Sequence, residues 1–97
     1  MEPMATIGVL TLELRLENSH SLKEKRHMVK SLRDRLHNKF NVSVAEIDCH
    51  DLWQRAVVAA VTVSRDRLHA EQVLQSVEHE TASLLGPALA GVTVEWM

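Results

Sequence analysis

Residues 53–64 read Trp-Gln-Arg-Ala-Val-Val-Ala-Ala-Val-Thr-Val-Ser and form an almost unbroken apolar run. The two sets of alternating side chains in this run are both largely apolar. A strand that is apolar on both sides is typical of the interior of a sheet. We therefore predict a central β-strand over residues 53–64.

The residues before this strand predict three further elements. Residues 7–17 alternate leucine with polar side chains, which predicts a strand with one buried face. Ser21-Leu22-Lys23-Glu24 matches a capping box and predicts a helix from Leu22 to about Asn38. A second strand is predicted over residues 41–48, followed by a loop, Asp48-Cys49-His50-Asp51.

The residues after the central strand predict a second helix and a last strand. Ser64 or Asp66 can cap this helix, and Gly86-Pro87 ends it. The last strand is short and alternates over residues 92–96. With right-handed crossovers, the order βαββαβ favours a single ferredoxin-like domain over residues 1–97. We expect an α+β sandwich whose four-stranded antiparallel sheet carries both helices on one face, with strands 7–17 and 53–64 central.

Composition excludes several classes of protein. With 97 residues, 45% of them hydrophobic and 25% charged, the chain is neither disordered nor collagen-like. No stretch approaches the ~18 apolar residues of a membrane span, and no basic segment of a signal peptide precedes residue 16. The single cysteine, Cys49, excludes an intrachain disulfide. We expect a cytoplasmic protein without a membrane partner.

The predicted fold leaves one face of the sheet without helices. Either Ala56, Val58 and Ala60 or the alternate set of the central strand must lie on that face. An apolar sheet face of this kind favours a partner, most simply a second copy in a homodimer. The alternative is that small side chains tolerate exposure to water.

Positive charge is concentrated in the first predicted helix. Seven of the eleven basic residues lie between residues 23 and 39 with two acidic ones, so this segment has a net charge of +5. The remainder is −7, since the whole chain is −2. The basic residues are Lys23, Lys25, Arg26, Lys30, Arg33, Arg35 and Lys39. This asymmetry indicates a polyanion-binding side, although a solvated helix face is an equally simple interpretation.

Helical spacing places Arg26, Lys30, Arg33 and His37 in one stripe. Lys23 and Lys25 lie in the first turn, where the helix dipole disfavours cations. An anion bound there would offset this cost. The alternative for Lys25 is that its aliphatic stem covers the edge of the core.

The predicted topology brings the turn at residues 18–20 close to the loop at residues 48–51. Six side chains can converge there: His20, Lys23, Lys25, His50, Trp53 and Arg55. The alternative interpretation is that Trp53 packs at the rim of the core and that Arg55 pairs with Asp48 or Asp51.

Sequence motifs for catalysis or cofactors are missing. Cys49, His50 and Asp51 are consecutive and point in different directions, so they cannot form a catalytic line. No two histidines are four residues apart, and there is no glycine-rich phosphate loop. The strands also lack the aromatic residues on which RNA-recognition motifs stack bases. We predict no catalytic residues, no metal and no cofactor.

Three segments together resemble the YlxP-like family of uncharacterised bacterial proteins: His-Ser-Leu-Lys-Glu-Lys-Arg at 20–26, Asn-Val-Ser-Val-Ala-Glu at 41–46 and Asp-Leu-Trp-Gln-Arg-Ala at 51–56. The resemblance covers residues 5–82 and implies a ferredoxin-like fold. The genes of this family often lie beside those of translation initiation and ribosome-maturation factors, which implies a connection with RNA or the ribosome.

Two functional hypotheses follow. The first is a non-enzymatic RNA- or ribosome-associated protein that contacts phosphates through the first helix. The second is a dimeric module that binds a small anionic metabolite at the same end of the domain. The predicted anion-binding residues are His20, Lys23, Lys25, Arg26, Lys30, Arg33 and Arg55, beside the family-signature residues Ser21, Glu24, Asp51, Trp53 and Gln54.

Overall fold

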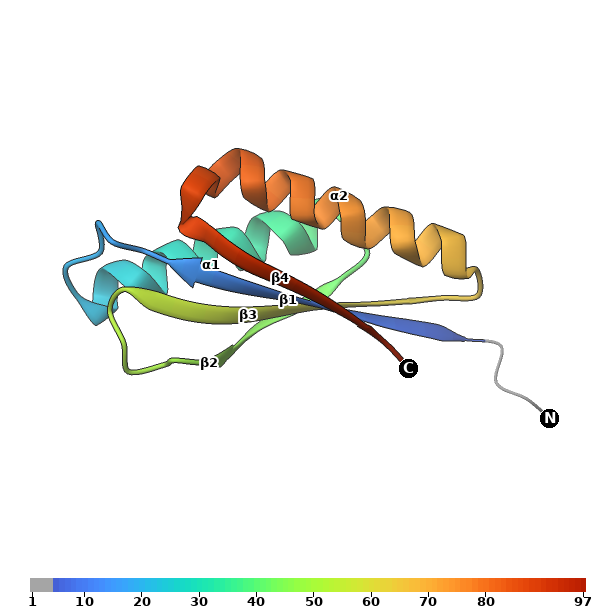
Figure 1. Ribbon diagram of the computed structural model, residues 1–97, viewed down its shortest axis with the longest axis horizontal. Coiled ribbons are helices and arrows are strands. Elements are labelled where there is room, and N and C mark those ends of the chain that lie inside the picture. Colours follow the sequence, from blue (N-terminus) through green and yellow to red (C-terminus); the bar gives the residue numbers. More distant parts are fainter. Residues whose placement is uncertain (1–4) are drawn as a thin grey trace.

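The computed structural model describes residues 5–97, so the first four residues of the predicted domain lie outside the described residues. The elements are β1 (Thr6–Arg15), α1 (Leu22–Lys39), β2 (Ser43–Asp48), β3 (Arg55–Ser64), α2 (Arg67–Leu85), a short 3₁₀ turn (Gly86–Ala88) and β4 (Leu89–Trp96). The strands form one antiparallel sheet in the order β2-β3-β1-β4, and both helices lie on the same side of it (Figure 1). The predicted architecture, with the first and third strands central, is confirmed.

The core is built from β1 and β3 in a fixed register. Leucines of β1 lie opposite small or medium-sized residues of β3, as in the pair Leu10 and Ala60 and the pair Leu12 and Val58. All four of these side chains are fully buried beneath the helices. Because neighbouring residues of a strand point to opposite sides, the alternate set of β3 lies on the helix-free face. The ambiguity over which set faces the open side is thus resolved.

Both helix starts use side-chain caps. The Ser21 hydroxyl accepts a hydrogen bond from the Glu24 backbone N–H at 3.1 Å. The Glu24 carboxylate accepts one from the backbone N–H of His20 at 2.6 Å, one residue before the predicted partner, Ser21. Asp66, the second of the two predicted caps for α2, accepts from the backbone N–H groups of Leu68 and His69.

β1 ends, and β2 and β3 begin, inside the predicted bounds, whereas β4 begins three residues earlier than predicted, at Leu89. β1 ends at Arg15, although Leu16 remains buried and donates its backbone N–H to the Gln54 carbonyl at 2.8 Å. β2 and β3 each begin two residues later than predicted, at Ser43 and Arg55. The alternation of side chains and the backbone pairing do not end at the same residues, so the pattern alone does not fix the ends of the strands.

Within residues 5–97, neither helix has the length and apolar character needed to cross a lipid bilayer.

Glu80 of α2 joins the two helices through two cations of α1. Its carboxylate accepts from Arg35 Nε and from Lys39 Nζ, each at 2.7 Å. The hydrogen bond from Lys39, followed by that from Arg35, holds the pKa of Glu80 below its ordinary value of 4.5.

This lowered pKa predicts an acid-sensitive contact between the helices. A carboxyl group whose pKa is lower in the folded state stabilises the fold above its ordinary pKa and loses that contribution as the pH falls through its folded pKa. We expect Glu80→Gln to flatten the decline in melting temperature on acidification below about pH 5. Glu78→Gln, on the same helix and without an ion pair among residues 5–97, is the matched control. Equal acid sensitivity in the wild type and Glu80→Gln would contradict the prediction.

Candidate nucleic-acid interface

Lys25 is the centre of a buried polar cluster at the N-terminal end of α1. Its side chain is 0% exposed. Its ammonium group donates to Glu46 Oε2 at 2.9 Å, to the Cys49 carbonyl at 2.7 Å and to the His50 carbonyl at 3.1 Å. Three acceptors match the three protons of an ammonium group. Lys25 therefore connects α1 to β2 and to the loop between β2 and β3.

Gln54 makes a second connection at this end of the molecule. Its side-chain amide donates to the carbonyl oxygens of Glu17 at 3.1 Å and of Ser19 at 3.2 Å. Both acceptors lie in the loop between β1 and α1. Together, Lys25 and Gln54 hold two loops that are more than thirty residues apart in sequence.

This arrangement corrects part of the predicted site. Lys25 was predicted to bind an external anion or, as the alternative, to cover the edge of the core with its aliphatic stem. Its side chain is buried, in agreement with the alternative, and its charge and protons are engaged inside the protein. Ser21, Glu24 and Gln54, also among the family-signature residues, make internal hydrogen bonds that shape the same region. Sequence reasoning gave Glu46 no role. Its position on the core side of β2, two residues after Val44, is the signal that could have indicated a buried cationic partner.

Four exposed cations remain on one flank of α1. Lys23, Arg26, Lys30 and Arg33 are exposed and recur at three- and four-residue intervals, which places them on one side of the helix. Within residues 5–97, the first three have no carboxylate within 4.0 Å, while Arg33 lies 3.4 Å from Asp34. We call these four residues the α1 stripe.

The α1 stripe faces the edge strand β2. At its C-terminal end, Arg33 and His37 share a shallow hollow of about 270 Å³ with Ser43 and Val44 of β2. The other flank of α1 faces α2, where Glu80 neutralises Arg35 and Lys39. Among residues 5–97, the lysine and arginine side chains of α1 that have no acidic partner thus lie on one flank of the helix.

The remaining predicted residues do not come together with the α1 stripe in one pocket. His20 is exposed in the loop that precedes α1. Trp53 is 54% exposed, so about half of its side chain is open to a ligand. Arg55 forms no ion pair with Asp48 or Asp51, and it lies in register with Arg15 on the helix-free face of the sheet. Arg55 is therefore separated from the α1 stripe by the sheet.

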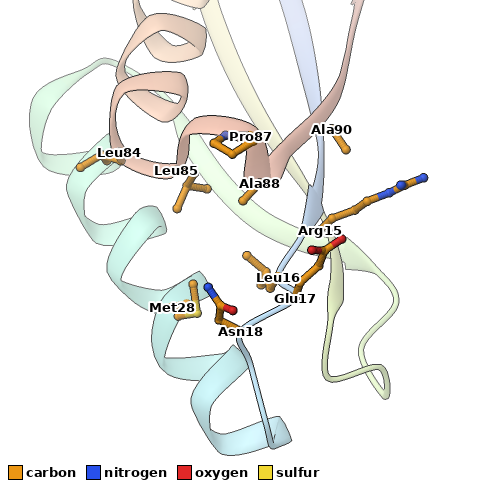
Figure 2. A pocket seen from close by; sticks show the side chains of 10 residues that line it. All are labelled: Arg15, Leu16, Glu17, Asn18, Met28, Leu84, Leu85, Pro87, Ala88 and Ala90. Carbon is orange, nitrogen blue, oxygen red and sulfur yellow. The ribbon is translucent and has the colours of Figure 1, made fainter.

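A hollow of about 480 Å³ lies where the connection from α2 to β4 meets the end of β1. Figure 2 shows Met28 and Asn18 on one side of it and Leu85 and Pro87 across from them, while the Arg15 side chain points away. Its charged lining is limited to Arg15 and Glu17. A mostly apolar hollow that includes a carboxylate does not favour a small anion.

Cys49 has the one positive φ angle, 64°, among the non-glycine residues from 5 to 97. This conformation directs its carbonyl toward Lys25, and its backbone N–H donates to Asp48 Oδ1 at 2.7 Å. A left-handed conformation costs an ordinary residue about 1–2 kcal/mol, and more if the side chain is β-branched.

The stability of the protein is expected to depend on the backbone conformation of Cys49 and not on its thiol. Cys49→Ser should leave the melting temperature and any binding unchanged, and Cys49→Gly should match or exceed the stability of the wild type. Cys49→Val, whose side chain is β-branched, should lose about 1–2 kcal/mol. Thermal and urea denaturation of the three variants test this order. A loss of binding in folded Cys49→Ser would instead assign the thiol a function.

The fold and the α1 stripe define a small ferredoxin-like α+β protein with a cationic helix flank. Residues 7–87 match the family described as "Protein of unknown function (DUF503)". The chain is also 42% identical over 71 residues to "Uncharacterized protein YlxP" of Bacillus subtilis (strain 168), a match covering 73% of this chain and 77% of that protein. The chain therefore belongs to the DUF503 family, and it is similar to YlxP.

Solved structures share the fold at low sequence identity. The designed protein Foldit4 is 13% identical with a TM-score of 0.59, and the match covers 96% of both chains. A dimeric ferredoxin-like protein of unknown function from Thermobifida fusca YX is 14% identical with a TM-score of 0.51, covering 96% of this chain and 90% of that one. Both likenesses concern the fold alone.

Proposed function

We propose that this protein is non-enzymatic and associates with RNA or the ribosome. It contacts phosphates through the α1 stripe. The observation that carries the proposal is the set of exposed cations on one flank of α1, three of which have no acidic partner within residues 5–97. From Lys23 to Arg33 the stripe spans about 15 Å of helix axis. A row of charges of this length suits several successive phosphates better than one small anion.

Two further features support contact with the RNA backbone over reading of bases. The helix-free face has no aromatic side chain on β1 or β3, so it offers no surface for stacking bases. The loop between β2 and β3 places Trp53, more than half exposed, at the same end of the molecule as Lys23. Trp53 can stack on one unpaired base beside the phosphates held by α1.

The test is the salt dependence of binding to a fluorescein-labelled single-stranded RNA, measured by fluorescence anisotropy. Four phosphate contacts predict a slope of about −3 for log K against log salt. Inorganic phosphate at millimolar concentration should weaken RNA binding no more than another salt of the same ionic strength. A slope near zero, or one-site displacement by phosphate, would reject the proposal in favour of a module that binds a small anion.

A further inference from the structure

The helix-free face of the sheet is an apolar surface that no part of residues 5–97 covers. Its larger apolar side chains come from three strands: Ile7, Val9, Ile47, Val57, Val61 and Val63. Val63 is 55% exposed, Ile47 53% and Ile7 37%. The opposite face carries both helices, as Figure 1 shows. We infer that the helix-free face is the contact surface of a homodimer, which goes beyond the proposed function.

The size of this face meets the requirement of a stable dimer. Four strands spaced by ~4.8 Å, with about eight residues each at ~3.3 Å per residue, span roughly 500 Å² in projection. The corrugated accessible surface is larger than this projection. Two copies packed face to face thus bury more than about 1,000 Å² in total, the range in which specific interfaces begin.

The charges on this face are arranged so that a second copy fits. Arg15 and Arg55 lie side by side at one end of the central strands, and two register positions further in Glu13 and Asp48 flank Val57 on the same face. Glu95 of β4 pairs with Val9 toward the other end. If the two-fold axis lies in the plane of the sheets and perpendicular to the strands, the arginine end of one copy lies over the Glu95 end of the other. If the axis instead runs parallel to the strands, the four guanidinium groups of the two copies lie together and repel one another.

The inferred interface leaves the α1 stripe free. The stripe belongs to the helix layer, on the far side of the sheet from the apolar face. Dimerisation therefore needs no RNA, and the failure of one proposal would not entail the failure of the other.

The experiment is sedimentation equilibrium of nuclease-treated protein from about 5 to about 200 µM. The wild type should approach twice the chain mass of 11.0 kDa. Val63→Glu and Ile47→Glu should each weaken dimerisation at least tenfold. The matched control is Leu68→Glu on α2, because Leu68 is 61% exposed but lies in the helix layer.

Circular dichroism tests whether each variant is folded. If one glutamate variant unfolds, the other, which lies on a different strand, still tests whether the helix-free face forms the dimer contact. A monomeric wild type at about 200 µM would overturn the inference. So would dimers of Val63→Glu and Ile47→Glu that are as stable as the wild type, or a Leu68→Glu variant that dissociates equally.

Discussion

Lys25→Ala is expected to destabilise the fold by about 3–5 kcal/mol, the largest effect of any single substitution considered. The substitution leaves the Glu46 carboxylate, only 13% exposed, without its cation. It also removes the hydrogen-bond donor from two backbone carbonyls and opens a cavity under α1. Domains of this size have a total stability of about 5–15 kcal/mol, so a large share of that stability would be lost.

The matched control is Lys23→Ala, the same substitution two residues earlier on the same helix. Lys23 is exposed and has no carboxylate within 4.0 Å in residues 5–97, so its removal should change stability by no more than about 0.5 kcal/mol. Thermal unfolding should show Lys25→Ala melting at least about 12 °C below the wild type. Similar melting temperatures for the two variants would show that the buried ammonium group is dispensable.

A second variant separates loss of charge from loss of packing. Lys25→Met keeps most of the side-chain volume but leaves Glu46 unpaired. Adding Glu46→Leu removes that unpaired charge, so the double variant should be more stable than Lys25→Met alone. If Glu46→Leu lowers the stability of Lys25→Met further, Lys25 stabilises the fold through packing and through its contacts with the two backbone carbonyls.

The triple variant Lys23→Gln, Arg26→Gln and Lys30→Gln is expected to weaken binding to single-stranded RNA about a hundredfold. Three phosphate contacts at a net ~1 kcal/mol each account for this magnitude. The salt slope should become shallower by about 2. The melting temperature should stay the same or rise slightly, because Lys23 opposes the helix dipole in the first turn.

The control for this variant is Arg35→Gln with Lys39→Gln on the opposite flank of α1. These cations are engaged by Glu80, so their loss should lower stability but change RNA affinity less than about threefold. The triple variant is thus expected to lower RNA affinity without lowering stability, and the double variant to lower stability with little change in RNA affinity. Equal loss of affinity in both would indicate attraction by net charge rather than an interface along the α1 stripe.

Local sequence patterns were sufficient for the fold. The alternation of leucines in residues 7–17 and the two apolar faces of residues 53–64 are properties of neighbouring residues, and they predicted β1 and β3 as central strands. The capping box at Ser21 and the Gly86-Pro87 stop predicted the ends of the helices within one residue. Such signals work because backbone geometry has a fixed period of two in strands and 3.6 in helices.

The stripe of exposed cations could also be predicted from helical spacing, but the role of each cation could not. Lys25 and Lys23 are two residues apart and chemically identical, yet one is buried and the other exposed. The difference depends on Glu46, Cys49 and His50, which lie 21–25 residues away in sequence. Likewise, only the folded chain brings Glu80 to Arg35 and Lys39. Sequence alone determined which faces are apolar and where charge is concentrated. Tertiary structure decided which charges are compensated internally and which remain free for a ligand, because compensation depends on distances that local periodicity does not set.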